Sequence, residues 1–90
     1  MSDEQAASAV KVTVYSAPWC GFCKMAKSYL TGKNVDFTDI NIEEDRSAAM
    51  HIVEKTGQAG IPVIEIGNET ILGFDRAAID LALRSNKMVS

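Results

Sequence analysis

Cys20 and Cys23 are the two cysteines of this 90-residue chain, and only Gly21 and Phe22 separate them. An alternating, strand-like pattern precedes the pair, and a pattern with helical spacing follows it. In a chain without other cysteines, a C-x-x-C pair between a strand and a helix is typical of a dithiol that is reversibly oxidised. The spacing therefore predicts thiol–disulfide chemistry.

The chemistry explains why the two thiols are one helical turn apart. At a helix N-terminus, unpaired backbone N–H groups and the positive end of the helix dipole stabilise a thiolate, here at Cys20. A thiol one turn later, at Cys23, can attack a mixed disulfide formed at the first. We predict Cys20 as the exposed nucleophile and Cys23 as the more buried resolving thiol, with Lys24 and Lys27 adding positive charge nearby.

Other uses of a cysteine pair fit this chain less well. A structural zinc site needs four ligands, and His51 is the one further soft candidate, so we predict no metal site. Haem attachment requires a histidine directly after the second cysteine, and that residue is Lys24. A structural disulfide that closes so short a loop would contribute little to stability.

Hydropathy patterns predict seven elements in the order β-α-β-α-β-β-α. The strands are expected at 10–15, 35–40, 61–66 and 69–72, and the helices at 21–30, 43–56 and about 76–86. Gly57 is predicted to cap the second helix and Asp75 to begin the third. The predicted fold class is α/β, a mixed four-stranded sheet flanked by helices on both faces. Residues 1–9 are expected to form a flexible N-terminal tail and residues 10–90 a single domain.

Side chains outside the cysteine motif receive ordinary structural interpretations. We predict that Ala48, Ala49, Ile52 and Val53 share one face of the second helix, and that Met25 and Met50 fill gaps in the core. His51 is interpreted as a solvated surface histidine. The acidic stretch 36–45 is interpreted as a solvated face, with acidic residues in the first turn of the second helix.

Composition limits the classes of function. The chain is 47% hydrophobic and 23% charged, with a formal net charge of −3 and a sequence pI near 5.0. A nucleic-acid-binding protein normally has a basic patch, so we expect no nucleic-acid partner. No apolar run approaches the length of about 20 residues that a membrane span needs, and no secretory signal is recognised. We expect a cytoplasmic monomer.

Several motifs together resemble those of the glutaredoxin-like small dithiol redoxins, which have the thioredoxin fold. These motifs are Val12–Tyr15, Cys20–Lys24, Thr56–Gly57, Gly60–Pro62 and Gly73–Asp75, and the resemblance covers about residues 10–84. It implies that Pro62 is a cis-proline facing the cysteines and that the backbone of Ile61 binds the substrate. It also implies that Gly73, Phe74 and Asp75 hold the γ-glutamyl end of glutathione. Glutathione would be a co-substrate, with no tightly bound cofactor.

The resemblance leaves the electron donor open between glutathione and a thioredoxin reductase. Glutaredoxins often carry a lysine where this chain has Ala17, whereas Trp19 before Cys20 is similar to thioredoxins. Trp19 and Phe22 flank the nucleophile, and we predict that they form a docking patch for a partner's disulfide loop. The predicted function is a thiol–disulfide oxidoreductase that reduces protein or low-molecular-weight disulfides.

An alternative function of another class is a glutathione-dependent iron–sulfur cluster carrier. Cys20-Gly-Phe-Cys23 differs only in its last residue from the Cys-Gly-Phe-Ser motif of cluster-binding monothiol glutaredoxins. Cys23 and Ala17 count against this alternative.

Overall fold

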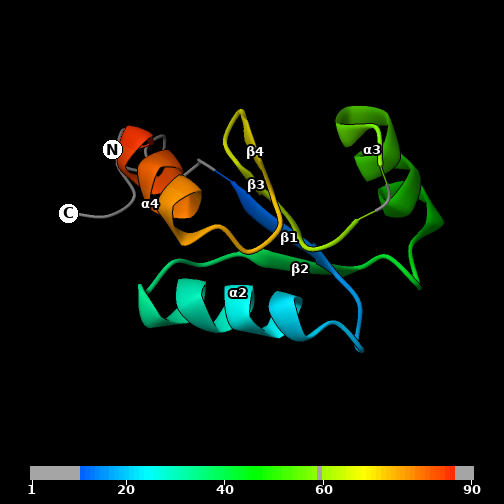
Figure 1. The fold of residues 1–90 in the computed structure, drawn as a ribbon, viewed down its shortest axis with the longest axis horizontal. Coiled ribbons are helices and arrows are strands. Elements are labelled where there is room, and N and C mark those ends of the chain that lie inside the picture. Colours follow the sequence, from blue (N-terminus) through cyan, green and yellow to red (C-terminus); the bar gives the residue numbers. More distant parts are fainter. Residues whose placement is uncertain (1–10, 59, 87–90) are drawn as a thin grey trace, which may run out of the picture.

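The structure, a computed structural model, describes residues 11–58 and 60–86, and the predicted tail at 1–9 lies outside them. The element order confirms the predicted β-α-β-α-β-β-α arrangement (Figure 1). The elements are β1 (Val12–Ser16), α2 (Gly21–Gly32), β2 (Thr38–Asn41), α3 (Arg46–Thr56), β3 (Val63–Ile66), β4 (Glu69–Leu72) and α4 (Arg76–Ser85).

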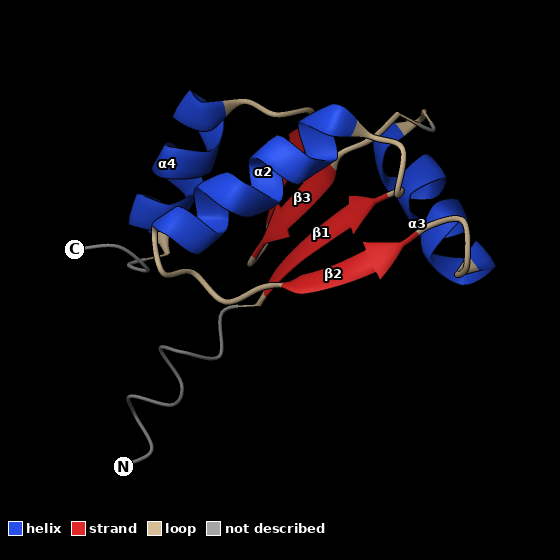
Figure 2. Cartoon of the chain, turned by 90° about the horizontal axis from the view of Figure 1, so that it is seen from below, coloured by secondary structure: helices blue, strands red, loops and turns tan. Residues whose placement is uncertain are grey.

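The four strands form one mixed sheet in the order β2-β1-β3-β4. β1 is parallel to β2 and antiparallel to β3, and β3 is antiparallel to β4. The hairpin turns at Gly67, whose positive φ of 59° favours glycine. Helices α2 and α4 cover one face of the sheet and α3 covers the other (Figures 1 and 2), as predicted.

The central strand β1 is buried along its whole length because helices cover both of its faces. Val12 and Val14 pack with buried residues of α2 and α4, whereas Tyr15 packs with Ala48 and Ile52 of α3. This alternation follows from the period of two along a strand. Two separate clusters of apolar side chains therefore hold the helices to the sheet.

Several elements begin later than the sequence predicts, and in two of them the first predicted residues have other backbone or side-chain roles. Val35 is buried and its N–H donates to the carbonyl of Leu30 at 3.0 Å, so β2 begins only at Thr38. The carboxylate of Asp45 accepts the N–H of Ala48 at 3.0 Å and caps α3. The first turn of α3 consequently contains no acidic residue. The strand predicted at 61–66 is likewise shorter and begins at Val63.

The predicted burial of Met25 and Met50 is wrong, because both side chains are exposed, and Val53 of α3 is exposed as well. In α3 the buried positions are Ala48 and Ile52, four residues apart on one stripe of the helix. Gly57 ends this helix in the left-handed region, with φ of 78°, as predicted. None of the helices in the described part of the chain is long and apolar enough to cross a membrane.

A cluster of polar side chains joins α3 to the sheet around Glu65. One carboxylate oxygen accepts the Tyr15 hydroxyl at 3.0 Å, and the other lies 2.8 Å from His51 Nε2 and 3.0 Å from Lys55 Nζ. Burial raises the pKa of Glu65, but these hydrogen bonds outweigh burial and hold the pKa below its usual value of 4.5. Burial, together with Glu65, raises the pKa of Tyr15 to about 12. His51 is exposed, as predicted, but it is not merely solvated.

We predict that Glu65→Gln lowers the free energy of unfolding by about 1–2 kcal/mol at neutral pH, because charge-assisted hydrogen bonds are lost. The folded pKa of Glu65 lies below its unfolded value. Its ionisation therefore stabilises the fold fully above the unfolded pKa, and this contribution is lost as the pH falls through the folded pKa. Urea unfolding at neutral and acidic pH measures the difference. The matched control is Glu69→Gln, at an exposed position of β4, and an equal loss in both variants would contradict the prediction.

Candidate active site

The register of the sheet brings four loops to one end of the molecule. Ile40, Tyr15, Val63 and Leu72 are cross-strand partners in one row of the sheet. Beyond this row the chain continues from β1 into the cysteine loop, from β2 into residues 42–45 and from β4 into Gly73, while Pro62 precedes β3. Segments that are far apart in the sequence are therefore neighbours at this end.

Cys20 is the N-cap of α2, and it forms a disulfide with Cys23 in the first turn of that helix. The two Cα atoms are 5.2 Å apart, and the N–H of Cys23 points to Cys20 Sγ at 3.2 Å. Cys23 is fully buried, whereas Cys20 is 7% exposed. The predicted order of burial is therefore correct, but Cys20 is less exposed than the sequence predicts.

This geometry can support reversible oxidation of the pair. In the reduced state, the backbone N–H that reaches Cys20 Sγ and the N-terminus of α2 would stabilise a thiolate there. Cys23 is fully buried and Cys20 is slightly exposed, so a disulfide that approached from solvent would reach Cys20 first. Cys23, bonded to Cys20 in the structure, would then be placed to re-form the intramolecular disulfide.

The Ile61–Pro62 peptide bond is cis, and Pro62 is fully buried. The carbonyl of Pro62 accepts the N–H of Gly73 at 2.8 Å, which joins the loop before β3 to the loop after β4. Gly73 has a positive φ of 78°, a conformation that favours glycine. This backbone hydrogen bond thus holds together the two loops to which the resemblance assigns substrate binding, Ile61–Pro62 and Gly73–Asp75.

Asp75 and Phe74 both have structural partners. The carboxylate of Asp75 accepts the N–H of Ala78 at 3.1 Å and caps α4, as predicted. The ring of Phe74 packs edge-on against Tyr29 of α2, with the ring centroids 5.8 Å apart. The segment after Gly73 is therefore packed against the helix that carries the cysteines.

Two large aromatic side chains flank the disulfide and are open to solvent. Trp19 is 68% exposed and Phe22 is 64% exposed. The indole N–H of Trp19 donates to the carboxylate of Glu43, in the loop between β2 and α3. Sequence reasoning missed Glu43, since it lies 24 residues from Trp19 and no local pattern connects them.

The two lysines after Cys23 differ in their surroundings. Lys27 forms an ion pair with Asp39 of β2 at 2.8 Å, and Asp39 also accepts the Ser16 hydroxyl at 2.7 Å. Burial raises the pKa of Asp39, but the hydrogen bonds from Lys27 and Ser16 outweigh it and lower the pKa. Asp39 in the acidic stretch 36–45 is therefore an ion-pair partner, and Lys27 is engaged with it. Lys24 is exposed and has no ion-pair partner among the described residues.

Groups of three or more histidine, cysteine, aspartate or glutamate side chains that could hold a metal ion do not occur within residues 11–58 and 60–86.

Comparison with known proteins gives consistent matches. The glutaredoxin family model matches residues 12–71. A glutaredoxin-like 8.6 kDa protein from the rubredoxin operon of Clostridium pasteurianum is 41% identical over 69 residues, which are 77% of this chain and 92% of that protein. The N-acetyl-S-hydroxy-L-cysteine reductase of Bacillus subtilis is 29% identical over 86 residues, which are 89% of this chain and 90% of that enzyme.

Solved structures agree with the fold. A glutaredoxin from Archaeoglobus fulgidus is 25% identical and superposes with a TM-score of 0.76, covering 84% of this chain and 88% of the other. The glutaredoxin-like NrdH-redoxin of Escherichia coli, described as having a thioredoxin-like activity profile, is 25% identical with a TM-score of 0.72. That match covers 79% of this chain and 92% of the other. The mixed four-stranded sheet with its three helices is thus the thioredoxin fold, as predicted.

We predict that, in the reduced protein at neutral pH, iodoacetamide modifies Cys20 at least about tenfold faster than Cys23. The reason is that the helix N-terminus favours the Cys20 thiolate and that Cys20 is the less buried thiol. Mass spectrometry of peptides after timed alkylation measures both rates, and the denatured protein, in which the two rates should converge, is the control. Equal rates in the folded protein would contradict the assigned difference between the thiols.

Proposed function

The chain belongs to the glutaredoxin family, and we propose that it is a thiol–disulfide oxidoreductase that reduces protein or low-molecular-weight disulfides. The observation that carries this proposal is the Cys20–Cys23 disulfide at the N-terminus of α2, with the backbone N–H of Cys23 directed at Cys20 Sγ. Family membership supports the class of reaction. The direction, reduction of the substrate, rests on the resemblance, while the thiolate that the helix N-terminus favours accounts for the reactivity of Cys20.

In the proposed cycle, the Cys20 thiolate attacks one sulfur of a substrate disulfide. A mixed disulfide forms, and the first substrate thiolate leaves and takes up a proton from solvent. Cys23 then loses its proton to solvent and attacks Cys20 Sγ, and the second substrate thiol leaves. Two electrons pass from the dithiol to the substrate, and an external reductant returns them to the Cys20–Cys23 disulfide.

Residues around the pair receive proposed binding roles. The backbone of Ile61 beside cis-Pro62 would pair with the main chain of a bound thiol. Gly73, Phe74 and Asp75 would contact the γ-glutamyl end of glutathione, used as a co-substrate. The hydrogen bond between the Gly73 N–H and the Pro62 carbonyl supports a joint role, because it keeps the two loops at a fixed separation.

We keep two electron donors in the proposal, glutathione and a thioredoxin reductase. Family membership favours glutathione. The similarity to an NrdH-redoxin with a thioredoxin-like activity profile, and Ala17 where many glutaredoxins carry lysine, favour the reductase. The relatives from Clostridium and Bacillus are bacterial, and we propose a cytoplasmic location, where both systems keep dithiols reduced. We also propose that the chain acts as a monomer.

The Bacillus relative supports low-molecular-weight substrates in particular. Its name identifies an S-hydroxycysteine derivative as its substrate, and the match spans nearly the whole of both chains. Reduction of an S-hydroxy sulfur needs the same two thiols, since Cys20 would displace water and Cys23 would then displace the product. The iron–sulfur carrier alternative receives no further observation in its favour.

We predict that Cys23→Ser accumulates a mixed disulfide at Cys20 with a substrate disulfide, because the second displacement cannot occur. Non-reducing mass spectrometry should show the adduct, and steady-state reduction of a protein disulfide should fall by at least about tenfold, since the resolving nucleophile is gone. Cys20→Ser, the matched control, should form no adduct and have no activity. Protein disulfide turnover in Cys23→Ser at the parent rate would overturn the resolving role.

We predict that the double variant Trp19→Ala, Phe22→Ala loses protein disulfide reduction selectively. Exposed aromatic anchors contribute most to docking, so kcat/KM for insulin should fall by about five- to tenfold. The rate with bis(2-hydroxyethyl) disulfide should change by less than about twofold, because so small a molecule does not use the docking patch. Leu81→Ala, which removes an exposed apolar side chain from α4, is the control. Equal losses with both substrates would contradict a docking role.

A further inference from the structure

The indole of Trp19 is held at its edge while its surface stays open to solvent. The ring N–H donates to the carboxylate of Glu43, yet Trp19 remains 68% exposed. Because the N–H lies in the plane of the ring, this hydrogen bond leaves the π surface accessible. Among the described residues the cation–π contact lies elsewhere, between Lys33 and the ring of Tyr29. The π surface of Trp19 is therefore available to a cation of another molecule.

The loop that carries Glu43 is fixed to the strand that leads into the cysteine loop. The N–H of Ile42 donates at 2.9 Å to the carbonyl of Ser16, the last residue of β1. The N–H of Glu43 itself donates to Asn41 Oδ1 at 2.9 Å. Within residues 11–58 and 60–86, the Glu43 carboxylate forms no ion pair with a lysine, arginine or histidine. A negative charge thus stands beside Trp19 without a described cation of this chain paired to it.

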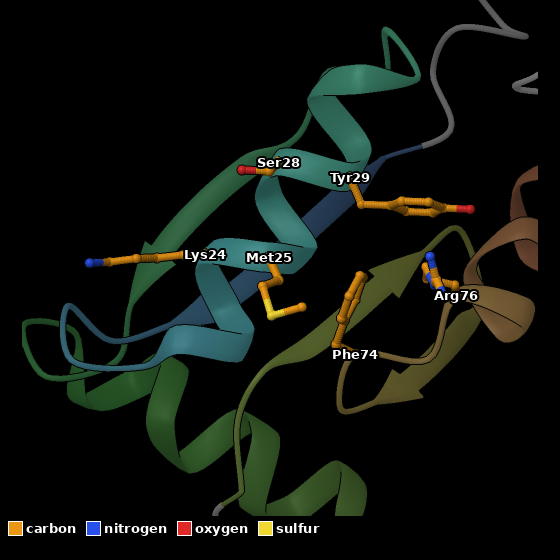
Figure 3. A pocket seen from close by; sticks show the side chains of 6 residues that line it. All are labelled: Lys24, Met25, Ser28, Tyr29, Phe74 and Arg76. Atoms are coloured by element: carbon orange, nitrogen blue, oxygen red, sulfur yellow. The ribbon is translucent and has the colours of Figure 1, made fainter.

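Charge of the opposite sign lines a surface hollow of about 460 Å³ between α2 and Phe74. Its charged residues are Lys24 and Arg76, and Figure 3 shows Lys24 extending from α2 away from Phe74. Both are exposed, and neither forms an ion pair in the described part of the chain. A cationic group of a substrate would be repelled by this hollow and attracted to Glu43.

We propose that Trp19 and Glu43 together bind a lysine or arginine side chain that flanks the disulfide of a peptide or protein substrate. The chain would thus select disulfides in cationic segments. This inference deepens the proposed function and rests on it. Trp19 directly precedes Cys20, and consecutive Cα atoms are about 3.8 Å apart. A residue next to the attacked cysteine of a substrate is therefore within reach of the indole.

The carboxylate strengthens this contact in two ways. Tryptophan is the aromatic side chain that attracts cations most strongly through its π surface. An anion bonded to the indole N–H polarises the ring and makes the π surface more negative. The carboxylate also attracts directly a guanidinium stacked on the ring. Trp19 and Glu43 are on this account specificity-determining residues, and they take no part in the electron transfer.

The redox step is the one described above, with the dithiol as the reductant. Cys20 forms a bond to one sulfur of the substrate disulfide while the sulfur–sulfur bond breaks. Cys23 then closes the intramolecular disulfide and releases the second substrate thiol. The two protons lost by the dithiol balance those taken up by the two released thiolates, so the reaction needs no co-reactant.

The test compares three symmetrical peptide disulfides that differ in charge. They are the oxidised dimers of acetyl-Arg-Cys-Arg-amide, of the same peptide with citrulline, the uncharged isostere of arginine, and of the same peptide with glutamate. The reduced full chain is mixed with each in a single turnover and stopped with acid, and chromatography measures the released peptide thiol. Flanking charges also change the reactivity of a disulfide itself. Each rate constant is therefore divided by that of dithiothreitol with the same peptide.

In the parent we expect the arginine peptide to react about five- to tenfold faster than the citrulline peptide, and the glutamate peptide to be slowest. Glu43→Gln keeps an acceptor for the indole N–H but removes the charge, and Trp19→Leu keeps an apolar side chain but removes the π surface. Each should lower the ratio of arginine to citrulline rates to about twofold, and the double variant should lower it to about one. Rates with the citrulline peptide should change by less than about twofold.

The matched control is Glu54→Gln, an equal loss of charge at an exposed position toward the other end of α3. It should keep the parental ratio, because solvent and salt screen a charge that is remote from the site. A change in ratio equal to that of Glu43→Gln would assign the selectivity to net charge and overturn the local site.

Other outcomes contradict the inference in recognisable ways. A ratio of about one in the parent would show that cationic segments are not selected. Retention of the parental ratio in either single variant would overturn the joint role of the two residues. An equal fall with all three peptides would assign the effect to the reactivity of Cys20. Failure of the parent to reduce any of the three disulfides, with both thiols free, would instead refute the proposed function on which the inference rests.

Discussion

The pairing of β1 with both of its neighbours is the constraint on which the site depends. Parallel pairing with β2 and antiparallel pairing with β3 set Ile40, Tyr15 and Val63 side by side. Beyond this row, at one end of the strands, lie the cysteine loop that follows β1 and the loop with cis-Pro62 that precedes β3. A register shift of one residue would exchange the two faces of β1 and would move both loops relative to each other.

Burial and polar contacts divide the molecule into a supporting part and a reactive part. The half-buried carboxylate of Glu65 and the more exposed carboxylate of Asp39 accept several hydrogen bonds and fix α3 and α2 to the sheet. Around the disulfide, by contrast, the large side chains of Trp19 and Phe22 are exposed. In the proposed function, these exposed aromatic groups beside the nearly buried Cys20 serve as the contact surface for a substrate that brings its own disulfide.

Much of the fold followed from the sequence because local signals agreed with one another. Alternation predicted four strands, Gly57 and Asp75 were recognised as caps, and the order of elements required a mixed sheet. Element starts were less predictable. The Asp45 cap and the buried Val35 depend on tertiary packing, and their sequence pattern also fits an earlier start for α3 and β2. Met25 and Met50 were misassigned since hydrophobicity alone does not show which side of a helix a narrow sheet covers.

The candidate site was recognised from two cysteines and their spacing, while its neighbours were recognised unequally. Trp19 and Phe22 are adjacent in sequence to the thiols and could be inferred. Glu43, which accepts the indole N–H of Trp19, reaches the site only through the fold. No local sequence pattern predicts contacts of this kind, so they are recognised only in the structure.

The central claim is that Cys20 and Cys23 carry electrons to disulfide substrates. NADPH consumption with bis(2-hydroxyethyl) disulfide tests it most directly, in parallel reactions with glutathione plus glutathione reductase and with a thioredoxin reductase alone. We predict turnover in at least one system, and none above background with Cys20→Ser in either. Turnover in one system alone would identify the electron donor. Silence of the parent in both systems, with two reactive thiols confirmed by titration, would contradict the account.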